Sequence, residues 1–514
     1  MSSSRSEYVA KNVSITLAMQ IVKNLLGFVN RTVFVYILGA EYLGVNSLFT
    51  DVLTVLSFAE LGIGNAMVFS LYKPIARGDQ EKIKSLMKLY AKTYQIIGIV
   101  IAGLGICLVP FIGHIVGDVS YIKENIILLY LLFLLNSVIS YFFVYKKSLI
   151  IACQKNYIVD IYQQIFYAFQ VVAQILFLAI TKQFIIYLML MVATTFLNNY
   201  FVAKKADKMY PFLKEKNIVP LEKNEIYDII KNVKALVVYK IGGIILESTD
   251  SIFISSIINV VTVGLYANYK IVVDVFRTIG SQVMNSIVAS VGNLNAGDDT
   301  EKKEKVFNEM FYISSWFYGF ATAGLCCFLS PLVSVWLGNK YVIGFDAVLA
   351  ACVYFYISNM HYPCYTYRTT AGLFVFGKYV PMFSAIINII LDIVMGRQWG
   401  LAGILWASSI ARIVTYELID PIIVYKKVFN KPVIKYFFQY AMLTVLIVVD
   451  AIVSYRVSFF VLRFDGFMGL ICRAVLFSVI FNVVFFLTTF KTPQFKSLMN
   501  RGKSVWKKMK TKGE

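Results

Sequence analysis

The sequence predicts an all-helical integral membrane protein, and three observations support this fold class. Of the 514 residues, 59% are hydrophobic and only 15% are charged, whereas a soluble globular chain carries about 25% charged residues. The apolar residues form runs of about twenty without the alternation of a strand, which is the length of a membrane-spanning helix. Lys and Arg gather in alternate connections between these runs, as the positive-inside rule expects of cytoplasmic loops.

Fourteen apolar runs reach this length. The segment before the first run is polar and has neither the apolar core nor the cleavage site of a secretory signal. The seventh and eighth runs are the most polar, and every run is bounded by polar or basic residues. The predicted spans are 12–38, 44–72, 88–113, 123–145, 157–180, 184–203, 233–258, 263–293, 307–336, 345–367, 374–396, 399–424, 434–455 and 467–489.

The distribution of basic residues sets the predicted orientation. With the N-terminus inside, 36 of the 49 Lys and Arg residues fall in inner segments and only six fall in outer loops. An odd number of spans would put the basic tail outside, against the positive-inside rule. We therefore predict fourteen spans with both termini inside. The outer loops are short, which leaves no room for an extracellular catalytic domain.

The net charge of +20 does not indicate a nucleic-acid partner, because the basic residues are spread over many loops and one tail. The tail has apolar residues among its lysines, so it lies on the anionic inner leaflet or is simply solvated. All seven cysteines lie in or beside apolar runs. They have neither a disulfide framework nor metal-ligand spacing, and we interpret them as small hydrophobic residues.

The chain also resembles itself at an offset of about 220 residues. Four segments recur; Gly44 aligns with Gly264, and the Gly-Asp pair at 78–79 aligns with that at 297–298. Six spans separate the copies, an even number, so the repeat is parallel. We predict an N-terminal lobe at 1–203, a basic linker at 204–232, a C-terminal lobe at 233–424, two further helices at 434–489 and a basic cytoplasmic tail at 490–514.

Charged residues occur within the spans that this repeat relates, the first two and the seventh and eighth. Each ionised group near the bilayer centre costs about 2.5–3.5 kcal/mol to insert, so such residues usually face a bundle interior or a water-filled cavity. Their spacing follows single helical faces. The basic residues are Lys23, Arg31, Lys240, Lys270 and Arg277, and the acidic residues are Asp51, Glu60, Glu247, Asp250 and Asp274.

Two interpretations of these ten residues are open. In the first, they form ion pairs that only fix helix packing, for example Arg277 with Asp250 or Lys270 with Asp274. In the second, the basic residues bind an anionic or diphosphate-bearing substrate, because Arg offers a planar fork for phosphate and Lys a point charge. The acids then serve as counterions or bind a coupling proton or sodium ion. No other cofactor and no metal site is predicted.

The remaining charges inside spans are scattered, and we assign them packing or interfacial roles. The two histidines, His114 and His361, are isolated and do not predict a metal or catalytic site. No nucleophile–base pair or phosphate-binding loop occurs. The scattered charges are Asp392, Arg412, Glu417, Asp420, Asp450 and Arg473.

Residues 37–79 resemble the signature region of the polysaccharide transporter family, the Wzx-type O-antigen, capsule and exopolysaccharide flippases of the multidrug/oligosaccharidyl-lipid/polysaccharide exporter superfamily. The segment ELGIGNA at 60–66, followed by a short basic Gly-Asp loop, is its most specific part. The resemblance implies a cleft lined by spans one, two, seven and eight. It implies an alternating-access flippase for an undecaprenyl-diphosphate-linked sugar unit, with the five basic residues at the diphosphate or acidic sugars.

The same resemblance implies membrane lipids, a polysaccharide polymerase and glycosyltransferases as partners, and the bacterial cytoplasmic membrane as the location. A flippase for a lipid-linked peptidoglycan precursor remains an alternative substrate assignment. A multidrug or cation antiporter would have an acidic cavity poor in cations, and a glycan polymerase would need a large outer loop. The sequence therefore predicts a transporter and not an enzyme.

Overall fold

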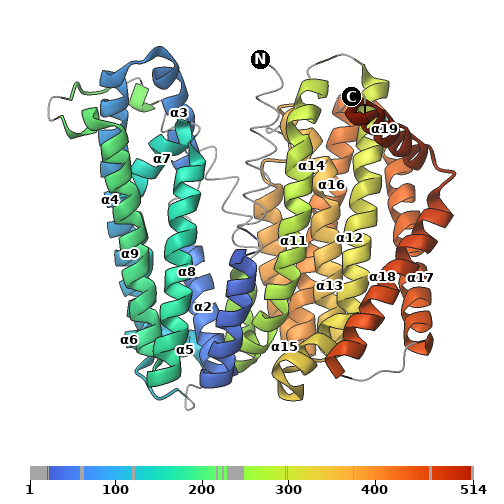
Figure 1. Ribbon diagram of the computed structural model, residues 1–514, viewed down its shortest axis with the longest axis horizontal. Helices are drawn as coiled ribbons and strands as arrows, with labels where there is room; N and C mark the ends of the chain where they lie inside the picture. Colours follow the sequence, from blue (N-terminus) through green and yellow to red (C-terminus); the bar gives the residue numbers. More distant parts are fainter. Residues whose placement is uncertain are drawn as a thin grey trace. The chain divides into compact units, whose positions relative to one another are not determined.

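The computed structural model describes residues 20, 22–57, 63–117, 122–153, 155–215, 218–222, 225–227, 248–295, 297, 299–373, 376–461 and 466–510. All regular structure in these residues is helical, as predicted (Figure 1). Contacts divide the chain into two compact units, residues 1–264 and residues 265–514. Glu60, Lys240 and Glu247, three of the predicted site residues, lie outside the described residues.

The first unit begins with a helix over residues 22–38 and contains a second unlabelled helix over 248–257. The predicted span 44–72 is represented by two helices, α2 and α3, with residues 58–62 outside the description. The labelled elements are α2 (Ala40–Leu56), α3 (Ile63–Arg77), α4 (Gln80–Leu108), η2 (Val109–Phe111), α5 (Ile112–Val116), α6 (Ile126–Tyr141), α7 (Val144–Ala152), α8 (Asn156–Thr181), α9 (Phe184–Met209) and η3 (Pro211–Lys214).

The second unit follows from α11, which starts at the end of the first unit. Predicted spans eleven and twelve appear as the single element α15, which turns at Gly400, where φ is 58°. The elements are α11 (Val260–Asn295), α12 (Thr300–Leu337), η4 (Asn339–Tyr341), α13 (Phe345–Met360), α14 (Tyr362–Thr370), α15 (Val380–Val414), α16 (Tyr416–Val424), η5 (Tyr425–Phe429), α17 (Ile434–Val461), α18 (Gly466–Thr489) and α19 (Pro493–Lys510).

Seven helices or helix runs among the described residues are long and apolar enough to cross a membrane. The pair α6 and α7, bent by 43°, forms an eighth candidate if it is counted as one span. The chain is thus a multi-pass membrane protein. The count of fourteen and the inward orientation of both termini stay predictions.

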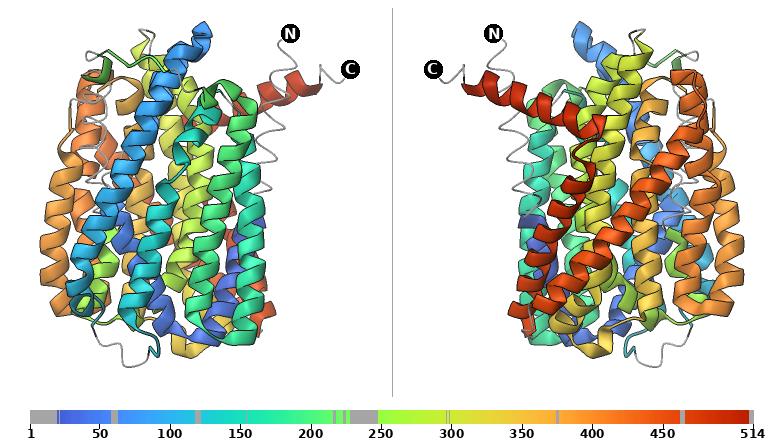
Figure 2. Two further views of the ribbon diagram at one scale, coloured as in Figure 1. Left: turned by 90° about the vertical axis from the view of Figure 1, so that its left-hand side faces the viewer. Right: turned by 90° about the vertical axis from the view of Figure 1, so that its right-hand side faces the viewer.

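The basic tail is a helix, α19, that runs across the direction of α17 and α18 (Figure 2). It is held against α12 by Glu309, whose carboxylate accepts a hydrogen bond from Ser497 at 2.6 Å and pairs with Arg501 at 2.9 Å. The first half of the tail therefore packs on the bundle and is not simply solvated.

Landmarks of the two units recur at the predicted offset. The helices α2 and α11 begin 220 residues apart, at Ala40 and Val260, and so do α4 and α12, at Gln80 and Thr300. Asp79 caps α4 by accepting a hydrogen bond from the backbone N–H of Lys82, and Asp299 caps α12 in the same way, both at 2.9 Å. The capping role makes Asp299 the equivalent of Asp79, one residue beyond the pairing that the sequence alignment suggested.

Two glycines bring α2 and the start of α11 into backbone contact within the first unit. A Cβ on Gly44 would lie 2.0 Å from the carbonyl oxygen of Val260, and a Cβ on Gly264 would lie 2.0 Å from that of Ala40. No side chain fits in either place. The contact is reciprocal, since each glycine faces the residue 220 positions from the other's partner. A twofold-related repeat makes contacts of this kind.

Candidate functional site

In the first unit, the helix over 22–38 carries Lys23 and Arg31 beside α8 and α9. Arg31 is half-buried and interacts electrostatically with Tyr187 of α9. Lys23 is exposed, and its Nζ lies 5.7 Å from the ring centroid of Tyr167 on α8. The two predicted basic residues of this helix thus each meet an aromatic side chain, and their neighbourhood is polar and aromatic, not lipid-like.

A network of amides and hydroxyls extends this polar face. Asn30 donates from Nδ2 to the Tyr187 hydroxyl at 3.0 Å and to Gln174 at 3.2 Å. Gln174, fully buried, donates in turn to the backbone oxygen of Tyr187 at 3.1 Å. Gln170 accepts a hydrogen bond from Thr194 at 3.0 Å. Sequence reasoning missed this network, although Gln170 and Gln174 are four residues apart and therefore share one face of a predicted helix.

Asp51 and Asp250, two of the predicted acids, belong to neighbouring positions of the same unit. Asp51 on α2 accepts a hydrogen bond at 2.5 Å from Ser251, the residue after Asp250. Both aspartates are half-buried. Predicted spans two and seven are therefore joined through a polar contact at the level of these acids.

In the second unit, Lys270, Asp274 and Arg277 lie on one face of α11 and are all half-buried. Arg277 pairs with Asp274 at 3.5 Å, with the two side chains 32% and 42% exposed. The packing interpretation had offered Lys270 as the partner of Asp274. The pair is still open to solvent, so both charges remain accessible.

The second unit also gathers charges that the sequence analysis described as scattered or isolated, which was wrong. Arg368 pairs with Asp420 at 2.6 Å, and Asp420 lies 3.1 Å from His361. His361 is in turn 3.5 Å from Glu417. Spacings of seven along α14 and three along α16 place these residues on facing helix surfaces, and that periodicity was the available signal.

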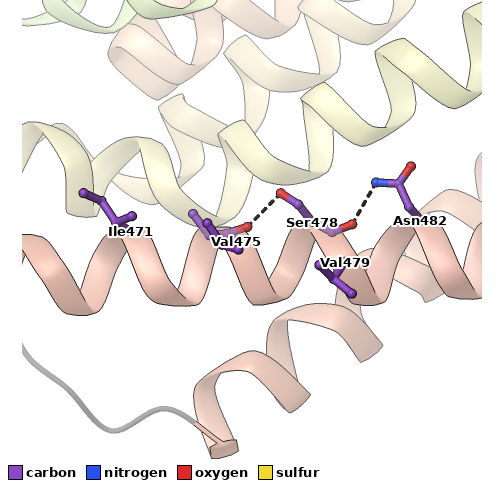
Figure 3. Close-up of a pocket in the computed structure, with 6 residues that line it drawn as sticks. Ile471, Val475, Ser478, Val479 and Asn482 are labelled. Atoms are coloured by element: carbon purple, nitrogen blue, oxygen red, sulfur yellow. Dashed lines mark hydrogen bonds between the residues drawn. The ribbon is translucent and has the colours of Figure 1, made fainter.

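A hollow of about 560 Å³ lies along α18 and is unrelated to these charges. Its lining comes from α18 alone, and the hydroxyl of Ser478 and the amide of Asn482 are bonded to backbone oxygens of the same helix (Figure 3). Such a groove with internally satisfied polar groups is suited to an acyl chain of the surrounding lipid.

A family model described as polysaccharide biosynthesis protein matches residues 9–291, more than half of the chain. The chain belongs to this family. The match covers helices 22–38, α2, α3 and much of α11, the elements that carry the predicted cavity residues. The resemblance seen in residues 37–79 is therefore confirmed. A comparison with curated protein sequences finds no match.

Solved structures of low sequence identity share the fold. The lipid II flippase MurJ in an inward closed conformation is 15% identical over 93% of this chain and 100% of its own, with a TM-score of 0.61. An inward-facing multidrug resistance MATE transporter of the MOP superfamily is 13% identical over 77% of this chain and 93% of its own, also at 0.61. The Vibrio cholerae MATE transporter VcmN in its bent form is 12% identical over 80% of this chain and 94% of its own, at 0.52.

The family and the shared fold together identify a multi-pass transport protein of the bacterial cytoplasmic membrane. The prediction that the chain is not an enzyme is confirmed by the transporters and flippases among its structural neighbours.

Proposed function

We propose that this protein is a flippase that moves an undecaprenyl-diphosphate-linked oligosaccharide from the inner to the outer leaflet for surface polysaccharide synthesis. The observation that carries the proposal is the polar face around Arg31, in a chain of the polysaccharide biosynthesis family. A guanidinium beside Tyr187, Asn30 and Gln174 offers a charge for a diphosphate and amides and hydroxyls for sugars.

The physical task explains the need for buried polar groups. A glycan and a diphosphate cannot cross hydrocarbon unaided, whereas a polyprenyl tail is soluble in it. In the proposed mechanism the headgroup binds to Lys23, Arg31, Lys240, Lys270 and Arg277 while the tail stays in lipid. The lobes at 1–203 and 233–424, within a fourteen-span chain with both termini inside, then alternate between inward and outward access.

The acids Asp51, Glu60, Glu247, Asp250 and Asp274 are proposed as counterions of the empty cavity or as sites of a coupling proton or sodium ion. Asp51 and Asp250 are half-buried and Asp274 faces Arg277, which suits a counterion that releases its partner to an incoming anion.

The decisive test compares two arginines in a deletion strain. Arg31→Ala is expected to abolish surface glycan, because the proposed anion contact is lost, with normal amounts of folded protein in the membrane. Arg397→Ala is the matched control, since Arg397 is exposed and is not one of the proposed cavity residues. Arg31→Lys is expected to restore part of the export, because Lys keeps the charge but not the bidentate fork. Full export by Arg31→Ala contradicts the assignment.

The alternative substrate is a lipid-linked peptidoglycan precursor, which the fold of MurJ keeps in view. It predicts that depletion of this protein causes cell lysis instead of loss of surface glycan. A multidrug antiporter predicts a change in drug resistance with surface glycan intact. The depletion phenotype thus separates the three substrate classes.

A further inference from the structure

The buried cluster of α14 and α16 has no role in the proposed substrate site. Its four side chains, His361, Arg368, Glu417 and Asp420, are between 0% and 7% exposed. The imidazole bridges the two carboxylates: Nδ1 lies 3.5 Å from Glu417 and Nε2 lies 3.1 Å from Asp420. Arg368 holds the other oxygen of Asp420 at 2.6 Å.

The carboxylate of Glu417 is the least satisfied member of this cluster. Neither of its oxygens accepts a hydrogen bond from the described residues, although both are buried. It borders a cavity of about 400 Å³ among α13, α16 and α17, whose other polar lining includes Tyr356, Tyr440 and Thr444. A buried carboxylate without donors is costly while ionised, and uptake of a proton relieves that cost.

Charge counting favours a proton over a metal cation at this site. Near neutral pH the tyrosines and the cysteine are uncharged, so Arg368 and Arg412 balance Glu417 and Asp420 when His361 is neutral. One added proton brings the cluster to a charge of +1. The described residues contain no group of three or more side chains placed for a metal ion. The titratable and charged groups facing His361 and Glu417 are Tyr356 of α13, Cys364 and Arg368 of α14, Arg412 of α15, Tyr416 and Asp420 of α16, and Tyr436 and Tyr440 of α17.

The cluster sits at two helix breaks. His361 is the residue between α13 and α14, and Thr415, two residues before Glu417, separates α15 from α16 with φ −118° and ψ −84°. A protonated His361 attracts both carboxylates of α16 and ties it to α14, whereas a neutral His361 leaves Arg368 as the ionic link. The protonation state therefore acts on the contact between two broken helices.

We propose that His361, Glu417 and Asp420 form a proton-binding site, which takes one proton from water and releases it to water on the opposite side during transport. The binding of the proton stands on the cluster itself. Its release on the opposite side rests on the proposed flippase function.

The presence of only two histidines makes the first part directly measurable. Full-length protein labelled with nitrogen-15 histidine is reconstituted into phospholipid vesicles, and its imidazole signals are followed by solid-state NMR from pH 5 to pH 8. The signal absent from His361→Gln is that of His361, and His114→Gln assigns the same signal by elimination if the first variant does not fold. The charged imidazolium of His361 is expected at pH 5 and the neutral ring at pH 8.

The carboxylate variants test the cluster. Glu417→Gln is expected to reduce the imidazolium fraction of His361 at pH 6 severalfold, because an opposing charge is removed. Glu417→Asp, which keeps the charge, is expected to have a smaller effect. The exposed His114 is expected to titrate alike in all variants. A His361 signal that is the same at pH 5 and pH 8, or that ignores Glu417→Gln, overturns the proton site.

Export in cells tests the second part. A protonophore is expected to stop surface glycan export by the wild-type protein, and Glu417→Gln is expected to reduce export at least tenfold, with Arg397→Ala as control. Export by Glu417→Gln at the wild-type level overturns the coupling role. If deletion of the gene leaves surface glycan unchanged, the flippase function fails while the NMR titration still decides the proton site.

Discussion

At the scale of single residues, the energetic cost of a charge in lipid was a reliable guide to position. It selected Lys23, Arg31 and Arg277, each of which the structure places beside polar, aromatic or oppositely charged groups. It could not select partners. Asn30 and Tyr187 are 157 residues apart, and their hydrogen bond depends on helix packing that no local pattern encodes.

The same limit explains why the histidine cluster was missed. His361 and Asp420 are far apart in sequence, and each alone resembles an ordinary packing residue. Only the packing of α14 on α16 brings them to 3.1 Å. Glu60, Lys240 and Glu247 stay predictions, as does the role of the whole set in binding.

A residue-scale prediction concerns Glu225, which follows α9 and forms an ion pair with Lys82 of α4. This hydrogen bond lowers the pKa of Glu225 below its usual value. A lowered folded-state pKa stabilises the fold above the unfolded pKa, about 4.3, and this contribution is lost as the pH falls through the folded value. Because both side chains are about a third exposed, the effect is small, under about 1 kcal/mol.

Thermal unfolding followed by tryptophan fluorescence measures this contribution. Glu225→Gln is expected to melt below the wild type at pH 7, and the difference is expected to shrink below pH 4. A gap that widens in acid would contradict the sign.

At the scale of helices, apolar run length predicted most elements, because each span is written locally in the sequence. Its errors fall where backbone geometry interrupts a run. The α13 helix ends at Met360 although the apolar pattern continues, and the turn at Gly400 replaces a loop. Such breaks depend on tertiary contacts, for example Gly403, where a Cβ would lie 2.0 Å from the carbonyl oxygen of Met395.

The glycine contact of α2 gives a prediction at this scale. Gly44→Ala and Gly264→Ala are each expected to lower the free energy of unfolding by at least about 1–3 kcal/mol, because a methyl group must force two backbones apart. Gly103→Ala in α4 is the control, since a Cβ there meets nothing within 4 Å. The measurement is the midpoint of thermal aggregation in detergent.

The double variant adds a sharper criterion. Gly44→Ala with Gly264→Ala should cost less than the two single effects added together, since both methyl groups separate the same backbones. Strict additivity, or a neutral Gly44→Ala, would mean that the two glycines do not share one contact.

At the scale of the whole molecule, composition and basic loops predicted the membrane class, and the family match and shared fold support it. The repeat was visible because helix starts and caps recur 220 residues apart. The number of spans and their direction were inferred from basic residues alone, and these are testable in cells.

Reporter fusions at Glu514 test the orientation. Green fluorescent protein placed there is expected to fluoresce and alkaline phosphatase to be inactive, because the C-terminus is predicted inside. The reverse pattern is expected for fusions after Lys340, in a predicted outer loop. An active phosphatase at Glu514 would require an odd number of spans.

The reciprocal contact of Gly44 with Val260 and of Gly264 with Ala40 bears on how such a chain arose. Each half supplies the same two positions, so two separate copies of a half-length ancestor would meet through one self-complementary patch. Such a patch makes a symmetric homodimer. Gene duplication and fusion would then preserve an interface that already existed, and afterwards the two halves were free to diverge, one toward the Arg31 network and the other toward the His361 cluster.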